Sequence, residues 1–169
     1  MKLKQIVFLI IFYNFFFLNV NAENKIVFLD IDYVINNSSI GKKILNNLNE
    51  LNENNVKILK KKETELKDIE NAIKSKKNLI SEEEYNKEII NLSTKITEFK
   101  DEKKRMVNDF NKKKDDEFLN LLSKIDPLIK KLMSENKIDV VIDKKNIIIG
   151  SKNSDITQDL IELINTNLQ

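Results

Sequence analysis

The sequence predicts an α+β protein in which a small β body carries a long α-helical coiled-coil hairpin arm. Residues 25–30 near the start, and residues 138–143 and 146–150 near the end, are mostly apolar and rich in the β-branched residues that favour strands. The chain between them is typical of long helices, because the whole sequence contains only two glycines and one proline. A single strand cannot bury itself, so the two apolar segments must meet and the helical hairpin must project from them.

The first 22 residues are predicted to be a signal peptide. Two lysines precede an apolar stretch at residues 6–18, and Ala22 ends a sequence suited to cleavage before Glu23. An uncleaved membrane anchor is the alternative, but the apolar stretch is shorter than the roughly 20 residues that a membrane-spanning helix needs. We therefore expect a mature chain that begins at Glu23 and works outside the cytoplasm.

Composition excludes several classes of function. The full chain has 29 basic and 27 acidic residues, and two of the lysines lie in the predicted signal peptide, so the mature chain has no net charge. This balance gives no support to a nucleic-acid or general polyanion partner. Histidine and cysteine are absent, which excludes imidazole and thiolate catalysis, disulfide bonds and metal sites built on these side chains. Export without cysteine fits a Gram-negative periplasm.

The predicted hairpin arm spans residues 40–133, with its tip at about residues 75–82. The flanking segments, residues 23–39 and 134–169, are assigned to the β body and oligomerisation region, which includes a C-terminal helix. This division follows from the change between strand-like and helical patterns along the chain.

Polar residues mark where the helices are expected to begin. Asp32 is expected to cap a short helical turn after the first strand, and Ser38 with Ser39 to cap the first long helix. Ser81 and Glu84 have the spacing of a capping box, in which each side chain bonds the backbone amide of the other residue. The second long helix is therefore expected to begin at Ser81.

The two long helices are expected to pack along a seam with coiled-coil spacing. Polar residues interrupt this seam in the first helix, whereas seam positions in the returning helix alternate regularly at intervals of four and three. The predicted seam residues are Leu59, Leu66, Ile73, Ile80, Tyr85, Ile89, Leu92, Ile96, Phe99, Met106 and Phe110.

The C-terminal part of the chain is expected to return to the body. Pro127 is expected to kink or break the returning helix near residues 124–126, or with equal weight to open a separate helix. Residues 138–149 are interpreted as a β-hairpin that turns at residues 143–146. Asp155 is expected to begin a last helix.

The predicted body is too small to form a sufficient hydrophobic core alone. Residues 26–29 and 147–149 are apolar without alternation, which indicates burial on both faces. A single chain cannot cover these faces, and association through the strands would also close the edges of the sheet. The residues expected in this oligomerisation body are Ile26, Val27, Phe28, Leu29, Val140, Val141, Ile142, Ile147, Ile148 and Ile149.

Apolar residues also lie outside the predicted seam, among them Ile58, Leu79 and Ile90. A charged arm with scattered apolar contacts could hold unfolded chains weakly and without sequence preference. Solvated coiled-coil faces have the same composition, so charge alone favours the plainer interpretation of a structural arm.

An enzyme is the class of protein with the least support. The sequence has no glycine-rich phosphate loop, and a strand end with a helix cap explains Asp30 and Asp32 more simply than a pair of catalytic carboxylates does. No catalytic residue, metal or cofactor is therefore predicted.

Several stretches of the chain resemble the Skp (OmpH-like) family of periplasmic chaperones. They are residues 25–30 with Val34, then 39–43, 79–84, 137–144 and 155–157, in the order that the family shows around a helical insertion. The resemblance covers essentially the whole mature chain.

The resemblance implies a homotrimer in which three β segments form a barrel-like body and three arms enclose a cavity. It also implies an ATP-independent holdase that binds unfolded outer-membrane β-barrel precursors in the periplasm. Family members are often strongly basic and favour anionic lipid, whereas this chain is balanced in charge, so only weak contact with a membrane surface is expected. The alternative function is that of a structural or scaffold coiled-coil protein of the cell envelope without chaperone activity.

Overall fold

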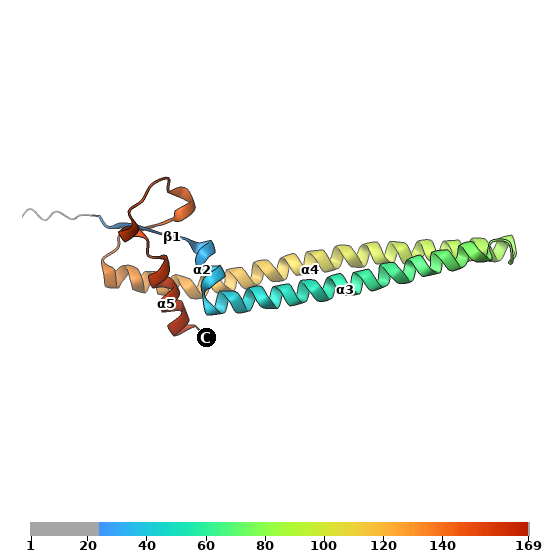
Figure 1. The fold of residues 1–169 in the computed structure, drawn as a ribbon, viewed down its shortest axis with the longest axis horizontal. Coiled ribbons are helices and arrows are strands. Elements are labelled where there is room, and N and C mark those ends of the chain that lie inside the picture. The colour runs from blue at the N-terminus through green and yellow to red at the C-terminus, as the bar shows by residue number, and fades with distance from the viewer. Residues whose placement is uncertain (1–23, 169) are drawn as a thin grey trace, which may run out of the picture.

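The computed structural model describes residues 24–168 and contains a small body with one long arm (Figure 1). The predicted signal peptide lies outside the described residues. The α+β fold class with a long helical hairpin is confirmed. In chain order the elements are β1 (Ile26–Leu29), α2 (Ile31–Asn37), α3 (Ser39–Lys76), α4 (Glu82–Asn136), β2 (Val140–Asp143), the short 3₁₀ turns η1 (Lys144–Asn146) and η2 (Lys152–Ser154), and α5 (Thr157–Asn167).

The two strands come from opposite ends of the chain and pair in parallel. Their register runs from Ile26 opposite Val140 to Leu29 opposite Asp143. Parallel neighbours need a crossover connection, and here the crossover includes the entire arm. With 38 residues in α3 and 55 in α4, the two arm helices are about 57 and 82 Å long at 1.5 Å per residue.

The core of the body lies where the base of the arm meets α5. Its fully buried members include Leu121 and Ile125 of α4 together with Leu160 and Ile164 of α5. Val27 of β1 joins the same cluster. The C-terminal part of α4 therefore belongs to the arm and to the body core at once.

The junction between α2 and α3 depends on two small residues. The buried hydroxyl of Ser38 caps α3 by accepting a hydrogen bond from the backbone amide of Gly41. A Cβ atom at Gly41 would lie 1.9 Å from the carbonyl oxygen of Ile35, so no larger residue fits while the two helices keep this approach. The junction thus fixes the direction in which the arm leaves the body.

The prediction that Asp32 caps the first short helix is wrong. α2 begins earlier, because the carboxylate of Asp30 accepts a hydrogen bond from the backbone amide of Tyr33 at 2.8 Å. Asp32 lies in the first turn of α2, where its negative charge is favourable to the helix dipole.

The predicted β-hairpin at residues 138–149 is also wrong. Only its first half forms a strand, β2, after which Asp143 accepts a hydrogen bond from the amide of Lys145 and the chain turns through η1. A strand needs a neighbour for its backbone groups, and the described sheet contains only β1 and β2. Residues 147–149 therefore stay outside the sheet of the single chain.

The predicted break at Pro127 is wrong, as is the alternative of a separate helix that begins there, whereas the expected kink stays a prediction. α4 is one helix with Pro127 inside it. Proline removes one backbone hydrogen bond from the helix, but Ile125 and Leu132 on either side are buried in the body core. This packing offsets the missing bond and keeps the helix continuous.

Candidate functional site

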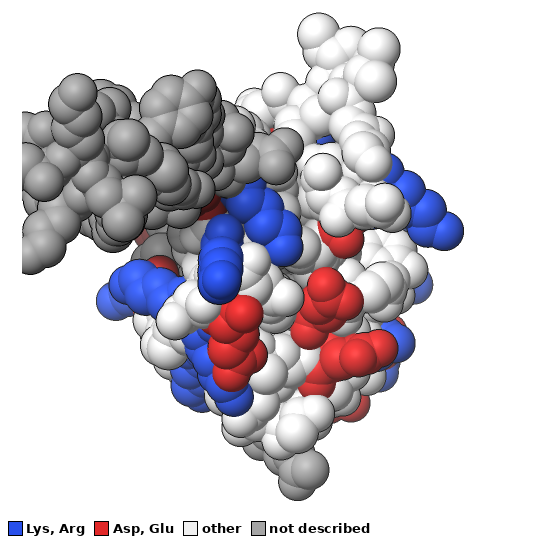
Figure 2. Space-filling model, turned by 90° about the vertical axis from the view of Figure 1, so that its left-hand side faces the viewer, with Lys and Arg blue, Asp and Glu red and all other residues white. Residues whose placement is uncertain are grey.

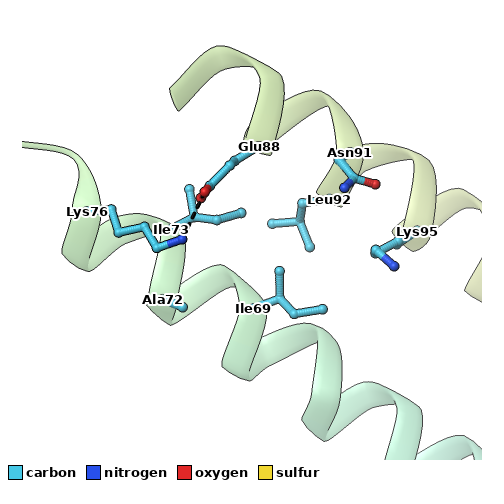
Figure 3. Close-up of a pocket in the computed structure, with 8 residues that line it drawn as sticks. All are labelled: Ile69, Ala72, Ile73, Lys76, Glu88, Asn91, Leu92 and Lys95. Atoms are coloured by element: carbon cyan, nitrogen blue, oxygen red, sulfur yellow. Dashed lines mark hydrogen bonds and ion pairs between the residues drawn. The ribbon is translucent and has the colours of Figure 1, made fainter. Parts of the chain in front are cut away.

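The arm is packed along a seam that is only partly buried. Ile73 and Leu92 are buried, with 4% and 7% of their surface exposed, and they face each other across the two helices (Figure 3). Of the other predicted seam residues, Ile89 and Ile96 are exposed, and the half-buried ones are Leu59, Leu66, Ile80, Tyr85, Phe99, Met106 and Phe110. Two helices cover only a narrow stripe of each other, so apolar surface remains in contact with water.

One side of the outer half of the arm is hollowed into a groove, which we call the distal groove. It consists of two adjoining concavities of about 300 and 200 Å³, one beside Ile73 and one beside Leu66. Both concavities share Ile69 and Lys95 in their linings. The floor of the groove is apolar and its rim is charged.

Two ion pairs connect the helices at the ends of the distal groove. The ammonium of Lys76 lies 2.9 Å from the carboxylate of Glu88 (Figure 3), and Lys62 pairs with Glu102. All four side chains are partly exposed to water, and such ion pairs typically contribute about 1 kcal/mol or less. They align the helices more than they stabilise them.

The tip of the arm is a short turn closed by a capping box. The hydroxyl of Ser81 accepts a hydrogen bond from the amide of Glu84 at 3.2 Å, and the carboxylate of Glu84 accepts one from the amide of Ser81 at 3.3 Å. Leu79 lies in the same turn with 81% of its surface exposed. The tip is therefore locally defined and ends in an exposed apolar side chain.

The body has its own exposed apolar surface, on the segment after η1. Ile148 and Ile149 are 98% and 91% exposed. The next residue, Gly150, lies so close to Phe28 that a Cβ atom would come within 2.5 Å of the aromatic ring. The structure thus packs this segment against β1 and directs two isoleucines into water.

The ten residues predicted for the oligomerisation body divide into three groups. Val27, Phe28 and Leu29 are buried beneath the body surface. The remaining residues are half-buried at Val141, Ile142 and Ile147, and exposed at Ile26, Val140, Ile148 and Ile149.

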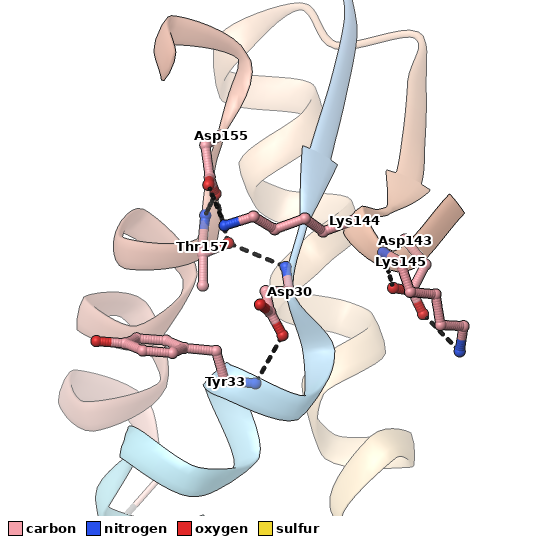
Figure 4. A network of polar contacts seen from close by, with 7 residues as sticks. All are labelled: Asp30, Tyr33, Asp143, Lys144, Lys145, Asp155 and Thr157. Atoms are coloured by element: carbon pink, nitrogen blue, oxygen red, sulfur yellow. Dashed lines mark hydrogen bonds and ion pairs between the residues drawn. The ribbon is translucent and has the colours of Figure 1, made fainter. Parts of the chain in front are cut away.

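A polar network connects β1, η1 and α5 (Figure 4). The amide of Asp30 donates to the hydroxyl of Thr157 at 3.0 Å, and the amide of Thr157 donates to the carboxylate of Asp155 at 3.1 Å. The ammonium of Lys144 lies 3.0 Å from the same carboxylate. Burial alone would raise the pKa of Asp155, but the Thr157 hydrogen bonds and the Lys144 charge outweigh burial and lower it.

A second pair in the network joins Asp143 and Lys145 at 2.8 Å (Figure 4). The hydrogen bond from Lys145 lowers the pKa of Asp143. The carboxylates of Asp143 and Asp155 therefore bond to neighbouring residues of the body, and their role is to stabilise its fold. In residues 24–168, no three side chains of the metal-binding types gather to hold a metal ion.

Charges of both signs are mixed on the end of the body that faces away from the arm (Figure 2). Basic side chains lie there among acidic ones, so this face is not a single-sign surface. Within the described part of the chain, none of the helices combines the length and apolar character needed to cross a membrane.

The fold and its surfaces define a class of protein in which a small body holds one long, solvent-exposed helical hairpin, with apolar side chains exposed on both. The family model described as outer membrane protein (OmpH-like) matches residues 25–164, and the chain belongs to this family. The family resemblance seen in the sequence is thereby confirmed.

A solved structure has the same fold. It is that of a candidate outer membrane chaperone (OmpH-like) from Caulobacter crescentus, with a TM-score of 0.80, 14% sequence identity and 87% of each chain covered. No curated protein matches the chain.

Sequence reasoning missed two of the residues that join the arm to the body. Leu121 and Ile125 are among the most deeply buried side chains, yet they lie beyond the predicted seam, which ends at Phe110. The signal is present in the sequence, because apolar residues recur at intervals of four and three from Leu121 to Leu132. Ala72, which lines the distal groove, carried no sequence signal.

Proposed function

We propose that this protein is an ATP-independent holdase of the periplasm that binds unfolded outer-membrane β-barrel precursors and prevents their aggregation. Membership of the OmpH-like family supports this function, as does the fold shared with a protein described as an outer membrane chaperone. The predicted cleavable signal peptide supports the location.

The observation that carries the proposal is the exposed apolar segment of the body. Ile148 and Ile149 project into water on the segment after η1, and the exposed Val140 lies on the edge strand β2. Water-exposed isoleucines and an open strand edge each favour association with further copies of the chain. We propose a homotrimer assembled through this surface, with three arms that enclose a cavity.

The arm supplies the type of surface that a holdase needs. Beyond the seam, exposed apolar side chains such as Ile58, Ile90 and Val107 are spaced along its length. Each buries little area and contributes weakly, so an unfolded chain that touches several of them is held without being trapped. Release would then require only competition from another binding site and no nucleotide.

Two measurements on the mature protein test this function. Its mass in solution should equal that of three chains, and it should suppress aggregation of a urea-denatured outer-membrane β-barrel on dilution without ATP. A trimer that leaves aggregation unchanged would favour the scaffold function, and a stable monomer without effect would contradict both the assembly and the holdase.

A further inference from the structure

Charged and uncharged residues are segregated on the outer part of α4. Between residues 84 and 99, the charged members are Glu84, Lys87, Glu88, Lys95 and Glu98. All five line the distal groove or the concavity that adjoins it near the tip. At roughly 100° of rotation per residue, they occupy one half of the helix. The opposite half of α4 is therefore free of charge over this length.

We call this uncharged half of α4 the neutral face. Its members are Asn86, Ile89, Ile90, Ser93, Ile96 and Thr97, which are all exposed and line none of these concavities. Ile90 is the most exposed of the three isoleucines, at 67%. The hydroxyl of Thr97 donates to the carbonyl of Ser93 at 3.0 Å, so its hydrogen bond is already made within the helix. The neutral face thus presents three isoleucines to water without a charge among them, and exposed apolar surface of this kind marks an interaction site.

The charged groups beside the neutral face lie across the seam, on α3. Lys67, Glu70 and Lys74 are exposed there and do not line the groove, and Glu70 pairs with Lys74 at 2.6 Å. An occupant as broad as a helix would cover these charged groups and remove their water, which is costly. A narrow occupant that follows α4 alone leaves them hydrated.

The length of the neutral face fits a short extended segment. From Asn86 to Thr97 the helix rises about 16.5 Å, which equals about five residues of extended chain at about 3.3 Å each. Alternate side chains of such a segment point the same way, so one set of them meets the three isoleucines while the other set faces water. The membrane-spanning strands of an outer-membrane β-barrel have this alternation of apolar and polar residues.

We infer that the neutral face of each arm holds one extended segment of an unfolded outer-membrane β-barrel, by contact with the apolar side chains that alternate along it. This inference rests on the holdase function proposed above and names the surface that performs it. Every arm of a trimer has the same orientation about the threefold axis. One neutral face per arm therefore suffices to line the cavity and to surround a client.

Other occupants fit the neutral face less well. Three partly exposed isoleucines offer at most about 300 Å² of apolar surface, whereas a stable contact between copies buries about 800 Å² on each partner. An anionic membrane surface attracts helices whose polar half is basic, but the charged half of α4 has three glutamates and two lysines over this length. A small apolar contact suits a client, because three arms act together while each single contact stays weak.

The first experiment locates the client on the full assembled chain. The protein has no cysteine, so Ser93→Cys on the neutral face and Asn91→Cys on the groove side each provide one attachment site for a photo-crosslinker. The two positions are exposed and lie two residues apart on the same helix. A urea-denatured outer-membrane β-barrel diluted into each protein should crosslink strongly to the Ser93→Cys protein and only weakly to the Asn91→Cys protein.

The second experiment measures how tightly the client is held. Ile90→Ser removes apolar contact from the neutral face of every arm, and Leu119→Ser is the matched control outside the face, because the two side chains are 67% and 65% exposed on the same helix. Ile90→Ser should weaken binding of the fluorescently labelled, urea-denatured β-barrel roughly tenfold. Leu119→Ser should leave the affinity unchanged.

The third experiment separates apolar contact from electrostatic attraction. Ser93→Glu and Ser93→Lys place charges of opposite sign in the middle of the neutral face. Both should weaken client binding alike, because either charge must lose water when an apolar segment covers it. Thr94→Glu and Thr94→Lys, at the next exposed position outside the face, should have little effect. Opposite effects of the two signs at Ser93 would overturn the inference in favour of an electrostatic site.

The outcomes separate this inference from the proposed function. Equal crosslinking from the two labelled positions, or an Ile90→Ser protein that binds the client as tightly as the wild type, overturns the inference even when aggregation is suppressed. A crosslink from the Ser93→Cys protein to a second copy, without client, also overturns it and assigns the face to an interface between copies. A synthetic peptide of one barrel strand that crosslinks to the Ser93→Cys protein, together with no suppression of aggregation, supports the strand-binding face and contradicts the holdase.

Discussion

The body and the arm of this molecule are stabilised in different ways. In the body, side chains such as Leu121, Ile125 and Leu160 are fully buried in one cluster to which two strands and several helices contribute. In the outer arm, only Ile73 and Leu92 are buried, and they form one well-packed point in a seam that is otherwise partly open. The difference teaches that one chain can combine a conventional core with an extension that relies on helical hydrogen bonds and a narrow contact.

This comparison predicts where the protein opens first. Regions with few buried apolar contacts open locally at lower free energy than the core does. The outer arm should therefore separate before the body unfolds. The substitutions below separate the two regions, from the largest expected effect to the smallest.

Val141→Asp should abolish assembly. Val141 lies opposite Val27 in the edge strand β2 and packs against the body core. An unpaired carboxylate there costs several kcal/mol and distorts the strand on which the proposed trimer depends. Light scattering should report the mass of a single chain. Val56→Asp, at an exposed arm position, should leave the mass unchanged, and a trimeric Val141→Asp protein would show that the interface lies elsewhere.

Ile125→Ala should destabilise the body. Ile125 is fully buried in the core, and removal of a buried isoleucine side chain to alanine costs about 2–5 kcal/mol. Urea denaturation followed by circular dichroism should show the midpoint falling for the whole molecule. A change confined to a fraction of the helical signal would contradict a core shared by arm and body.

Ile73→Ala should weaken the arm and spare the body. The seam around Ile73 borders the open distal groove, so the neighbouring side chains can relax and the cost should fall near the lower limit of about 2 kcal/mol. Hydrogen exchange should accelerate in the outer parts of α3 and α4 alone. Equal acceleration in α5 would show that the two regions unfold as one unit.

Asp155→Asn should reduce the acid sensitivity of the body by a small amount. The pKa of Asp155 is lowered in the folded state, so its charge stabilises the fold above the unfolded pKa of about 4 and this contribution disappears as the pH falls through the folded pKa. The free energy of unfolding at pH 7 minus that at pH 3 should be smaller in the variant by about 1 kcal/mol. An unchanged difference would mean that neither the Thr157 hydrogen bonds nor the Lys144 charge stabilises the folded protein through this carboxylate.

The sequence predicted the features that depend on local patterns. The seam spacing and the Ser81–Glu84 pair follow from the rules of single helices, and the structure has helices and a capping box at those positions. The errors concern tertiary context. Pro127 continues a helix because buried neighbours hold it, and residues 147–149 have strand composition but no neighbouring strand in the described chain.

The candidate surfaces were harder to predict than the fold. The apolar character of Ile90 is visible in the sequence, whereas the groove on the other side of α4 depends on how two helices meet. Ala72 matters there because its short side chain leaves space in the groove. The sequence alone does not show that an alanine at this position borders a groove. To predict a surface formed by two helices, one must know how the helices are aligned with each other, and the periodicity of each helix does not give this alignment.

The parallel pairing of β1 with β2 has a consequence for the order of folding. The hydrogen bond between Lys25 and Asp139 joins residues 114 positions apart, so the first strand is synthesised long before its neighbour. Closing so long a loop from a disordered chain is slow, whereas helices form within about a microsecond. We therefore expect α3 and α4 to pair first, beginning at the capped tip. The paired helices then bring the two ends of the chain close together, and the strands of the body pair last.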